Sequence, residues 1–142
     1  MPPTEPIGIA FVCVRNAGRS QMAAAFAERE RDRRGLDGRV RIESSGTDPG
    51  ARVHGVVVEA MAERGSDLSG RRPRELTREE LAGFDYVITM GCSAGEVCPA
   101  TWRGDARDWA LSDPGERDLD DVREIRDEVE RRVRALFDEL FD

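Results

Sequence analysis

The chain has 142 residues, a length typical of one domain with its own hydrophobic core, and we expect residues 1–142 to form a single domain. Its formal net charge is −7 and all 22 basic residues are arginines, which argues against general nucleic-acid binding. The N-terminus lacks the regions of a signal peptide and no apolar run approaches a membrane span, so we expect a cytoplasmic protein with no membrane partner.

The hydrophobic pattern predicts strands that alternate with helices. In chain order we expect a strand at 6–12, a helix at 19–34, a strand at 40–44, a helix at 54–65, a strand at 85–90, a short helix or loop around 93–101, a strand at 107–111 and a helix at 118–140. Residues 66–76 read as a polar loop whose arginines are solvated. This alternation predicts an α/β fold with a parallel sheet covered on both faces and a ligand beyond the carboxyl ends of the strands.

A short loop with a cysteine at its entrance joins the first strand to the first helix, Cys13-Val14-Arg15-Asn16-Ala17-Gly18-Arg19-Ser20. Asn16 and Gly18 permit left-handed backbone, so successive N–H groups can converge into an anion site the size of a phosphate, lined by residues 14–19. Amide dipoles and the Arg19 guanidinium favour the thiolate of Cys13, and the Ser20 hydroxyl can hydrogen-bond it. The pattern predicts a nucleophile aimed at a tetrahedral oxyanion. The alternative is a buried strand-end cysteine before an ordinary loop.

This loop, continued by Gln21-Met22-Ala23, resembles the phosphate-binding loop of the low-molecular-weight protein tyrosine phosphatases and of the arsenate reductases built on the same fold. Three further segments resemble that superfamily in the same order, Ser44-Ser45-Gly46-Thr47, Val87-Ile88-Thr89-Met90 and Trp109-Ala110-Leu111-Ser112-Asp113-Pro114. The resemblance covers nearly the whole chain. It implies a three-layer αβα fold with a four-stranded parallel sheet of flavodoxin-like topology. It also implies that Asp113 acts as a general acid, although Asp before Pro is also a common turn.

Two further cysteines, Cys92 and Cys98, resemble the redox loop of the thioredoxin-coupled arsenate reductases, which simple phosphatases of this fold do not require. Releasing arsenite from a thiol–arsenate adduct needs two electrons, which one cysteine cannot supply. We therefore expect Cys92 to attack Cys13, and Cys98 then to attack Cys92, so that thioredoxin or another thiol donor reduces the final disulfide. The alternatives are inert buried thiols or half of a zinc site, against which the single histidine, His54, argues.

Our interpretation is an arsenate reductase that needs no cofactor and no metal. The alternative is a low-molecular-weight phosphatase that hydrolyses phosphate monoesters through phosphocysteine, and a third hypothesis is a redox-sensing or anion-binding module. Gly115 stands where phosphatases specific for phosphotyrosine carry an aromatic residue. We expect Arg15 to add positive charge facing the anion and His54 to have no chemical role. A lysine-free acidic chain is also typical of halophiles, although codon bias alone explains the arginines.

Overall fold

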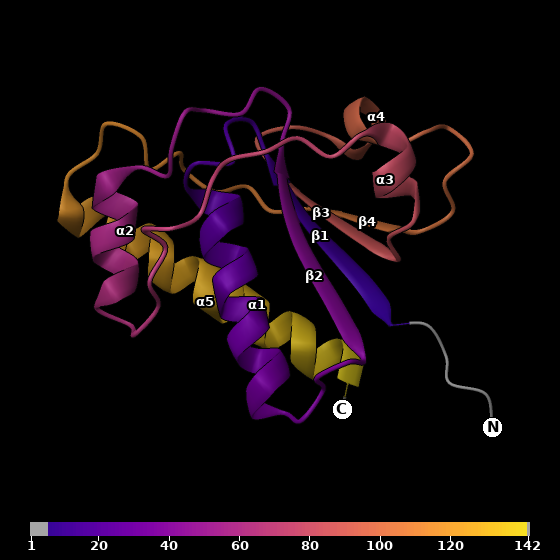
Figure 1. Cartoon of the computed structure of the whole chain (residues 1–142), viewed down its shortest axis with the longest axis horizontal. Coiled ribbons are helices and arrows are strands. Elements are labelled where there is room, and N and C mark those ends of the chain that lie inside the picture. The colour runs from indigo at the N-terminus through magenta and orange to yellow at the C-terminus, as the bar shows by residue number, and fades with distance from the viewer. Residues whose placement is uncertain (1–5, 142) are drawn as a thin grey trace.

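The computed structural model describes residues 6–141, in which four parallel strands form one sheet in the order β2-β1-β3-β4 (Figure 1). The strands are β1 (Ile7–Cys13), β2 (Val40–Gly46), β3 (Tyr86–Met90) and β4 (Asp105–Asp108). Cys13 is paired with Gly46 on one side and with Met90 on the other, so β2, β1 and β3 end level with one another. The carboxyl ends of these strands therefore form one edge, with the last residue of β1 at its centre.

Helices cover both faces of the sheet. One face carries α1 (Arg19–Arg33), α2 (Gly55–Ala62) and α5 (Leu119–Phe141), and the other carries the short helices α3 (Arg78–Ala82) and α4 (Ala94–Val97) (Figure 1). Successive residues of a strand point to opposite faces. Accordingly Phe11 and Cys13 belong to the cluster beneath α1 and α5, and Val12 belongs to the cluster beneath α3 and α4. The predicted three-layer α/β fold with a four-stranded parallel sheet is confirmed.

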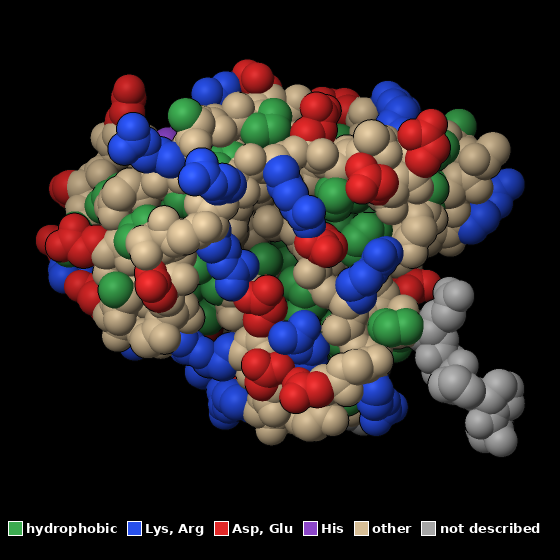
Figure 2. Space-filling model, in the orientation of Figure 1, with side chains coloured by type: hydrophobic (Ala, Val, Ile, Leu, Met, Phe, Trp, Pro, Cys, Tyr) green, Lys and Arg blue, Asp and Glu red, His purple; other side chains and the backbone are tan. Residues whose placement is uncertain are grey.

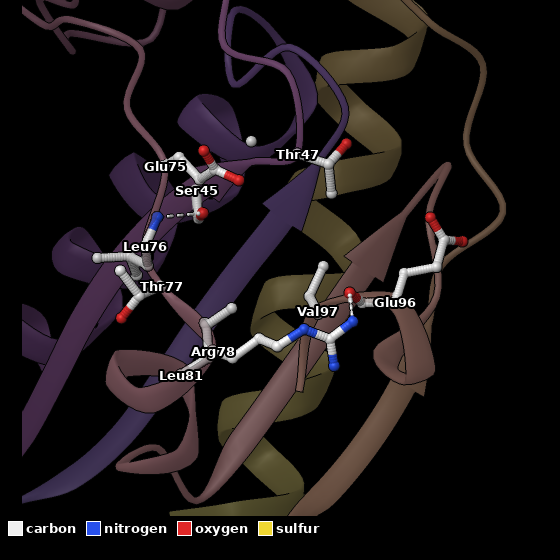
Figure 3. Close-up of a pocket in the computed structure, with 10 residues that line it drawn as sticks. Ser45, Thr47, Glu75, Leu76, Thr77, Arg78, Leu81, Glu96 and Val97 are labelled. Carbon is white, nitrogen blue, oxygen red and sulfur yellow. Dashed lines mark hydrogen bonds between the residues drawn. The ribbon is translucent and has the colours of Figure 1, made fainter. Parts of the chain in front are cut away.

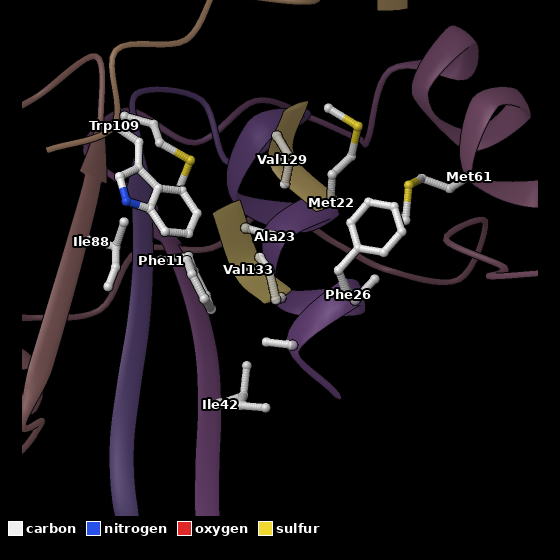
Figure 4. Close-up of a cluster of buried hydrophobic side chains, with 14 of the residues drawn as sticks. Phe11, Met22, Ala23, Phe26, Ile42, Met61, Ile88, Trp109, Val129 and Val133 are labelled. Atoms are coloured by element: carbon white, nitrogen blue, oxygen red, sulfur yellow. The ribbon is translucent and has the colours of Figure 1, made fainter. Parts of the chain in front are cut away.

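The larger cluster fixes the start of α1 against the end of β1 (Figure 4). The rings of Phe11 and Trp109 lie 5.9 Å apart, and Met22 and Phe26 of α1 are at most 2% exposed. The small residues Ala23–Ala25 give α1 a narrow face, which lets it approach both the sheet and α5 closely. Helix α1 is therefore held rigidly, and its first residue follows the loop that begins at Cys13.

The predicted strands and long helices are present, with ends within three residues of those expected, and the short helix expected around 93–101 spans only Ala94–Val97. The strand expected at 107–111 is present but begins and ends earlier, because it spans Asp105–Asp108. It pairs only with β3 and its residues are mostly exposed, so it carries no apolar pattern. The apolar residues that prompted the prediction follow the strand, where Trp109 packs into the core.

The sequence analysis also missed α3 and misjudged two arginines in the loop before it. Helix α3 begins with a capping box, in which the Thr77 hydroxyl and the Glu80 carboxylate each accept a backbone hydrogen bond from the other residue. In the loop, Arg71 forms an ion pair with Glu28 and Arg74 forms one with Glu43, so these side chains are not simply solvated. None of the helices described is at once long and apolar enough to span a lipid bilayer.

Candidate active site

Hydrogen bonds draw the carbonyl groups of the loop after β1 outward. The carbonyls of four loop residues accept backbone N–H groups of the segment 47–54, in the pairs Cys13 with Thr47, Val14 with Asp48, Arg15 with Gly50 and Ala17 with His54. In a trans peptide the following N–H points opposite to the carbonyl, so the N–H groups of residues 14, 15, 16 and 18 point into the loop. The segment 47–54 thus turns these four N–H groups towards a common concavity, a contribution that the sequence analysis had not foreseen.

Three residues make this tight geometry possible. Asn16 has the predicted left-handed backbone, with φ 52°. The same prediction is wrong for Gly18, which has φ −148°. Glycine is needed there for space, since a Cβ atom would lie 2.4 Å from Cγ of Pro114. Gly46 is equally confined, because a Cβ atom there would lie 2.8 Å from the carbonyl oxygen of Val14.

A chain of hydrogen bonds of fixed direction ends at the Cys13 thiol, which is buried. The backbone N–H of Arg74 can only donate, and it lies 3.0 Å from Oδ1 of Asn16. This assigns the Asn16 side chain, so that its Nδ2 donates to Oγ of Ser20 at 2.6 Å. The Ser20 hydroxyl lies 2.9 Å from Sγ of Cys13, which also accepts the Asn16 N–H at 3.3 Å. Both contacts suit a thiolate, which accepts hydrogen bonds and donates none.

Arg19, the first residue of α1, is buried beside the loop with one donor unused. Its Nη1 donates to the Leu111 carbonyl at 3.1 Å, and its Nη2 lies 3.9 Å from a carboxylate oxygen of Asp113. Its Nε is buried without a hydrogen-bond partner. Gly91 packs against this guanidinium: a Cβ atom at residue 91 would lie 3.0 Å from Nη1 of Arg19. The backbone of Gly91 is also left-handed, with φ 88°, which favours glycine. A buried donor without a partner is costly, and an oxyanion in the loop would satisfy it.

Asp113 reaches the mouth of the loop on the segment that follows β4. Its side chain is exposed, and its Oδ1 accepts the Gly115 N–H at 2.9 Å. Pro114 is buried against Gly18, so the two loops are in direct contact. His54 lies at the same junction, since its Nε2 is 3.3 Å from the position of a Cβ atom on Gly115. The structure thus brings Asp113 to Arg19, and it places beside them a histidine that the sequence analysis had left without a role.

The other two cysteines follow β3 and pack on the second core cluster, and all three cysteines are free thiols. Cys92 is half-buried, and its Sγ lies 3.6 Å from the carbonyl of Val12, the neighbour of Cys13. Burial, with a smaller contribution from the neighbouring Cys13, raises the pKa of Cys92 to about 11. Cys98 is buried, which also raises its pKa. Cys92 is therefore next to the loop, whereas Cys98 lies inside the cluster.

An open hollow of about 630 Å³ gives access to this region. It lies between the residues after β3 and those after β4, and its lining includes Gly91, Cys92, Glu96, Asp108 and Leu111. Arg15 lies against the segment after β2, where its guanidinium is 2.6 Å from the Asp48 carboxylate and half exposed, so Asp48 offsets the charge that we expected to face the anion. Within residues 6–141, no group of three or more His, Cys, Asp or Glu side chains is arranged to hold a metal ion.

Comparisons with known proteins find related sequences and structures. Residues 8–142 match the family model of low molecular weight phosphotyrosine protein phosphatases. A Halobacterium salinarum protein described as a "Putative arsenate reductase" is 57% identical over 130 residues, which cover 92% of this chain and 90% of the relative.

Two solved structures are also similar. A thioredoxin-dependent arsenate reductase of Corynebacterium glutamicum superimposes with a TM-score of 0.77 at 36% identity, covering 96% of this chain and 63% of that longer protein. The arginine phosphatase YwlE superimposes with a TM-score of 0.81 at 25% identity, covering 94% of this chain and 95% of that protein. The fold is thus shared by a protein named as an arsenate reductase and by one named as a phosphatase.

Proposed function

Because the chain belongs to the low molecular weight phosphotyrosine protein phosphatase family, we propose that it is an arsenate reductase that uses the phosphate-binding loop of that family to hold arsenate. The observation that carries the proposal is the set of three free thiols, one in the loop and two on the segment beside it. Hydrolysis of a phosphate ester needs only the first. Reduction of arsenate needs a source of two electrons, which the second and third thiols provide.

In the first step, the Cys13 thiolate attacks arsenic(V). A sulfur–arsenic bond forms, and one arsenate oxygen leaves as water after it takes a proton from Asp113. The loop N–H groups and the guanidinium of Arg19 hold the remaining oxygens, and the unused Nε of Arg19 gains its partner. Ser20 stabilises the thiolate before the attack. Residues 14–18 contribute through their backbone, since four of the N–H groups of the loop point inward.

In the second step, the Cys92 thiolate attacks Sγ of Cys13. A sulfur–sulfur bond forms and the sulfur–arsenic bond breaks, with its electron pair left on arsenic, which departs as arsenite. In the third step, Cys98 attacks Cys92, loses its proton and releases Cys13 as a thiolate. The new Cys92–Cys98 disulfide is then reduced by thioredoxin or another dithiol donor, for which we place the enzyme in the reducing cytoplasm.

The test is arsenite release from arsenate by the purified protein with thioredoxin, thioredoxin reductase and NADPH. We expect one arsenite for each NADPH oxidised. The variant Cys13→Ser is the control, and it should release none, because the hydroxyl cannot supply the thiolate. Absence of arsenite from the wild-type protein with thioredoxin, glutaredoxin or dithiothreitol as the donor would contradict the proposal.

Hydrolysis of phosphate monoesters is the second candidate function, and the contact between the Asp113 loop and the phosphate loop favours it. Asp113 lies where it can protonate a leaving alcohol, and water can resolve a phosphocysteine without electrons. A phosphate-ester assay on the same preparation separates the two functions. Hydrolysis without any arsenite release would assign the protein to the phosphatases.

A further inference from the structure

The side chain of Arg78, at the start of α3, spans the gap to the segment that carries the second and third cysteines (Figure 3). Its Nη2 donates to the Glu96 carbonyl at 2.9 Å and its Nη1 donates to the Cys98 carbonyl at 3.1 Å. Glu96 lies within α4 and Cys98 is its C-terminal cap residue. One guanidinium therefore holds the backbone on both sides of residue 97, immediately at the third cysteine.

Both ends of this segment are fixed independently of Arg78. At the beginning, Gly91 has φ 88° and packs on the guanidinium of Arg19. At the end, the indole N–H of Trp102 donates to the Phe84 carbonyl at 2.8 Å. Gly104 leaves room for that ring, because a Cβ atom there would lie 2.1 Å from it. Residues 92–101 thus form a strip of chain between two anchors, and Arg78 holds its middle.

Cys98 is only 4% exposed and packs among the side chains of the second core cluster, which include Val12, Leu81 and Val97. In the proposed relay, the Cys98 sulfur must leave this cluster, bond to Cys92 and become accessible to an external thiol donor. The backbone of Cys98 cannot move far while Arg78 holds its carbonyl. The hydrogen bonds of Arg78 must therefore break before Cys98 can react.

We propose that Arg78 is a latch that keeps Cys98 buried until the first disulfide has formed, and that its release sets the rate of the second disulfide exchange. Arg78 is a positioning residue, since it touches neither the oxyanion nor a reacting sulfur. The step that it controls conserves electrons: the Cys98 thiolate attacks Cys92, the Cys92–Cys98 bond forms, the Cys13–Cys92 bond breaks and Cys13 leaves as a thiolate. The latch rests on the proposed arsenate reductase function for its biological role.

The first experiment needs no arsenate. The reduced protein is treated with iodoacetamide, and alkylation of each cysteine is followed by peptide mass spectrometry. With Arg78→Met, which removes both hydrogen bonds and keeps an unbranched, flexible side chain, we expect Cys98 to be alkylated about tenfold faster. The charge of Arg78 lowers the pKa of Cys98, so a purely electrostatic role predicts slower alkylation of the variant. The two roles therefore predict opposite signs, and an equal or slower rate would overturn the latch.

Two further variants serve as controls for this experiment. Arg78→Lys keeps the charge and one donor, and it should react at a rate between those of the wild type and Arg78→Met. Arg39→Met is the matched control, because Arg39 is exposed and makes no side-chain hydrogen bond or ion pair with any residue in the described range 6–141. It should alkylate like the wild type. Faster alkylation of Cys13, Cys92 and Cys98 alike would indicate general loosening of the fold and would overturn the latch.

The second experiment places the latch in the reaction. After one turnover with arsenate, the Cys13–Cys92 and Cys92–Cys98 disulfides are quantified over time. In Arg78→Met the first disulfide and arsenite should form at the wild-type rate, and conversion to the second should be about tenfold faster. If the wild type forms no disulfide, the proposed function fails. If the wild type forms both and Arg78→Met converts them no faster, the latch fails.

Discussion

At the residue scale, directed hydrogen bonds converge on Cys13, the nucleophile of the proposed mechanism. The donor at the outer end of the chain is a backbone N–H, which cannot reverse its role, so Asn16 must present its amide nitrogen to Ser20. Gln21 supports this orientation, because its Nε2 donates to Oδ1 of Asn16 at 3.0 Å. Ser20 is left with its proton for the sulfur. The residue types are visible in the sequence, but the direction of the chain depends on the backbone of Arg74, 58 residues from Asn16.

Arg19→Lys tests the geometry of oxyanion binding at the scale of one side chain. Lysine keeps the charge but loses the planar pair of donors, including the Nε that has no partner in the described structure. We expect arsenate turnover to fall about a hundredfold with the fold intact, as for the loss of a preorganised donor at a transition state. Steady-state kinetics measure the turnover, and circular dichroism checks that the fold is intact. A rate close to that of the wild type would show that Arg19 does not bind the oxyanion.

Cys92 gives a prediction about pH. Because burial raises its pKa to about 11, its thiolate fraction increases as the pH rises towards that value. The rate of Cys13–Cys92 formation from a preformed arsenic adduct should therefore increase about tenfold for each pH unit near neutrality. Rapid acid quenching followed by peptide mapping measures this rate. A rate that does not change with pH over this range would mean that Cys92 reacts from a different environment.

At the scale of elements, the site is a junction of loops that follow different strands. The loop after β1 is lined on one side by the segment after β2, which takes its carbonyl groups, and on another by the segment after β4, which brings Asp113. Close packing fixes the positions of these loops relative to one another, notably where Gly18 contacts Pro114. Small shifts of one loop are therefore transmitted directly to the next.

Gly18→Ala tests this contact. A Cβ atom at 2.4 Å from Cγ of Pro114 cannot be accommodated, so the Asp113 loop should move away from the phosphate loop. We expect arsenate turnover to fall at least about tenfold, because the leaving oxygen loses its positioned acid. Gly50→Ala is the matched control, since its new Cβ would have no neighbour closer than 3.7 Å. Equal rates in the two variants would contradict a role for the contact between the loops.

The helices are joined by ion pairs that should make stability depend on pH. Glu63, next to the end of α2, accepts hydrogen bonds from Arg123 and Arg126 of α5, which lower its pKa to about 2. A lowered carboxylate pKa stabilises the fold above its unfolded value of 4.5, and this stability is lost as the pH falls towards about 2. As the pH falls from 4.5 towards about 2, the denaturant concentration at the midpoint of unfolding should decrease less steeply in Glu63→Gln than in the wild type. Denaturant titrations at several pH values measure this midpoint.

Glu124→Gln is the control for this experiment. Glu124 lies on the exposed side of α5 and has no hydrogen bond or ion pair within the part of the chain that the structure describes. Its removal should leave the pH dependence of the wild type in place. Parallel curves for Glu63→Gln and the wild type would show that the α2–α5 ion pairs do not contribute to acid sensitivity.

At the scale of the whole molecule, the surface mixes both signs of charge. Figure 2 shows arginine and acidic side chains interspersed over the face in view, with no separate basic field. Several arginines of the molecule join distant elements, as in Arg107 of β4 with Glu139 of α5. The net charge of −7 therefore reflects a surplus of acids over arginines that are largely paired. Such a surface is consistent with the halophilic source that the composition suggested.

The proposed thiol relay would connect cysteines of the two core clusters on opposite faces of the sheet, so its test involves the whole molecule. In Cys92→Ser we expect at most one arsenic adduct on Cys13 and no turnover. In Cys98→Ser we expect one arsenite for each enzyme and a trapped Cys13–Cys92 disulfide. Peptide mapping after a single turnover identifies each species. Phosphate-ester hydrolysis, if present, serves as the control because it should survive both changes. Full arsenate turnover in the double variant would exclude an intramolecular relay.

Sequence patterns predicted an α/β fold with a parallel sheet and a loop after the first strand in which Cys13, Arg19 and Ser20 lie together, as they do in the structure. These follow from local signals: an apolar strand, turn-forming residues and a helix in immediate succession. Local signals misplaced the ends of β4, because an exposed edge strand has no apolar face to reveal it. They also passed over α3, whose capping box at Thr77 and Glu80 was readable in the sequence.

Only the tertiary structure decided how separate segments meet at the site. The roles of the 47–54 segment, of Gly18 against Pro114, of His54 and of Arg78 depend on contacts between residues far apart in the chain. No periodicity or spacing encodes such contacts, because packing of the helices on the sheet determines which loops become neighbours. The sequence therefore determined which candidate groups the chain contains, and the packing of the core determined which of them lie together and that Cys98 is buried with its carbonyl bonded to Arg78.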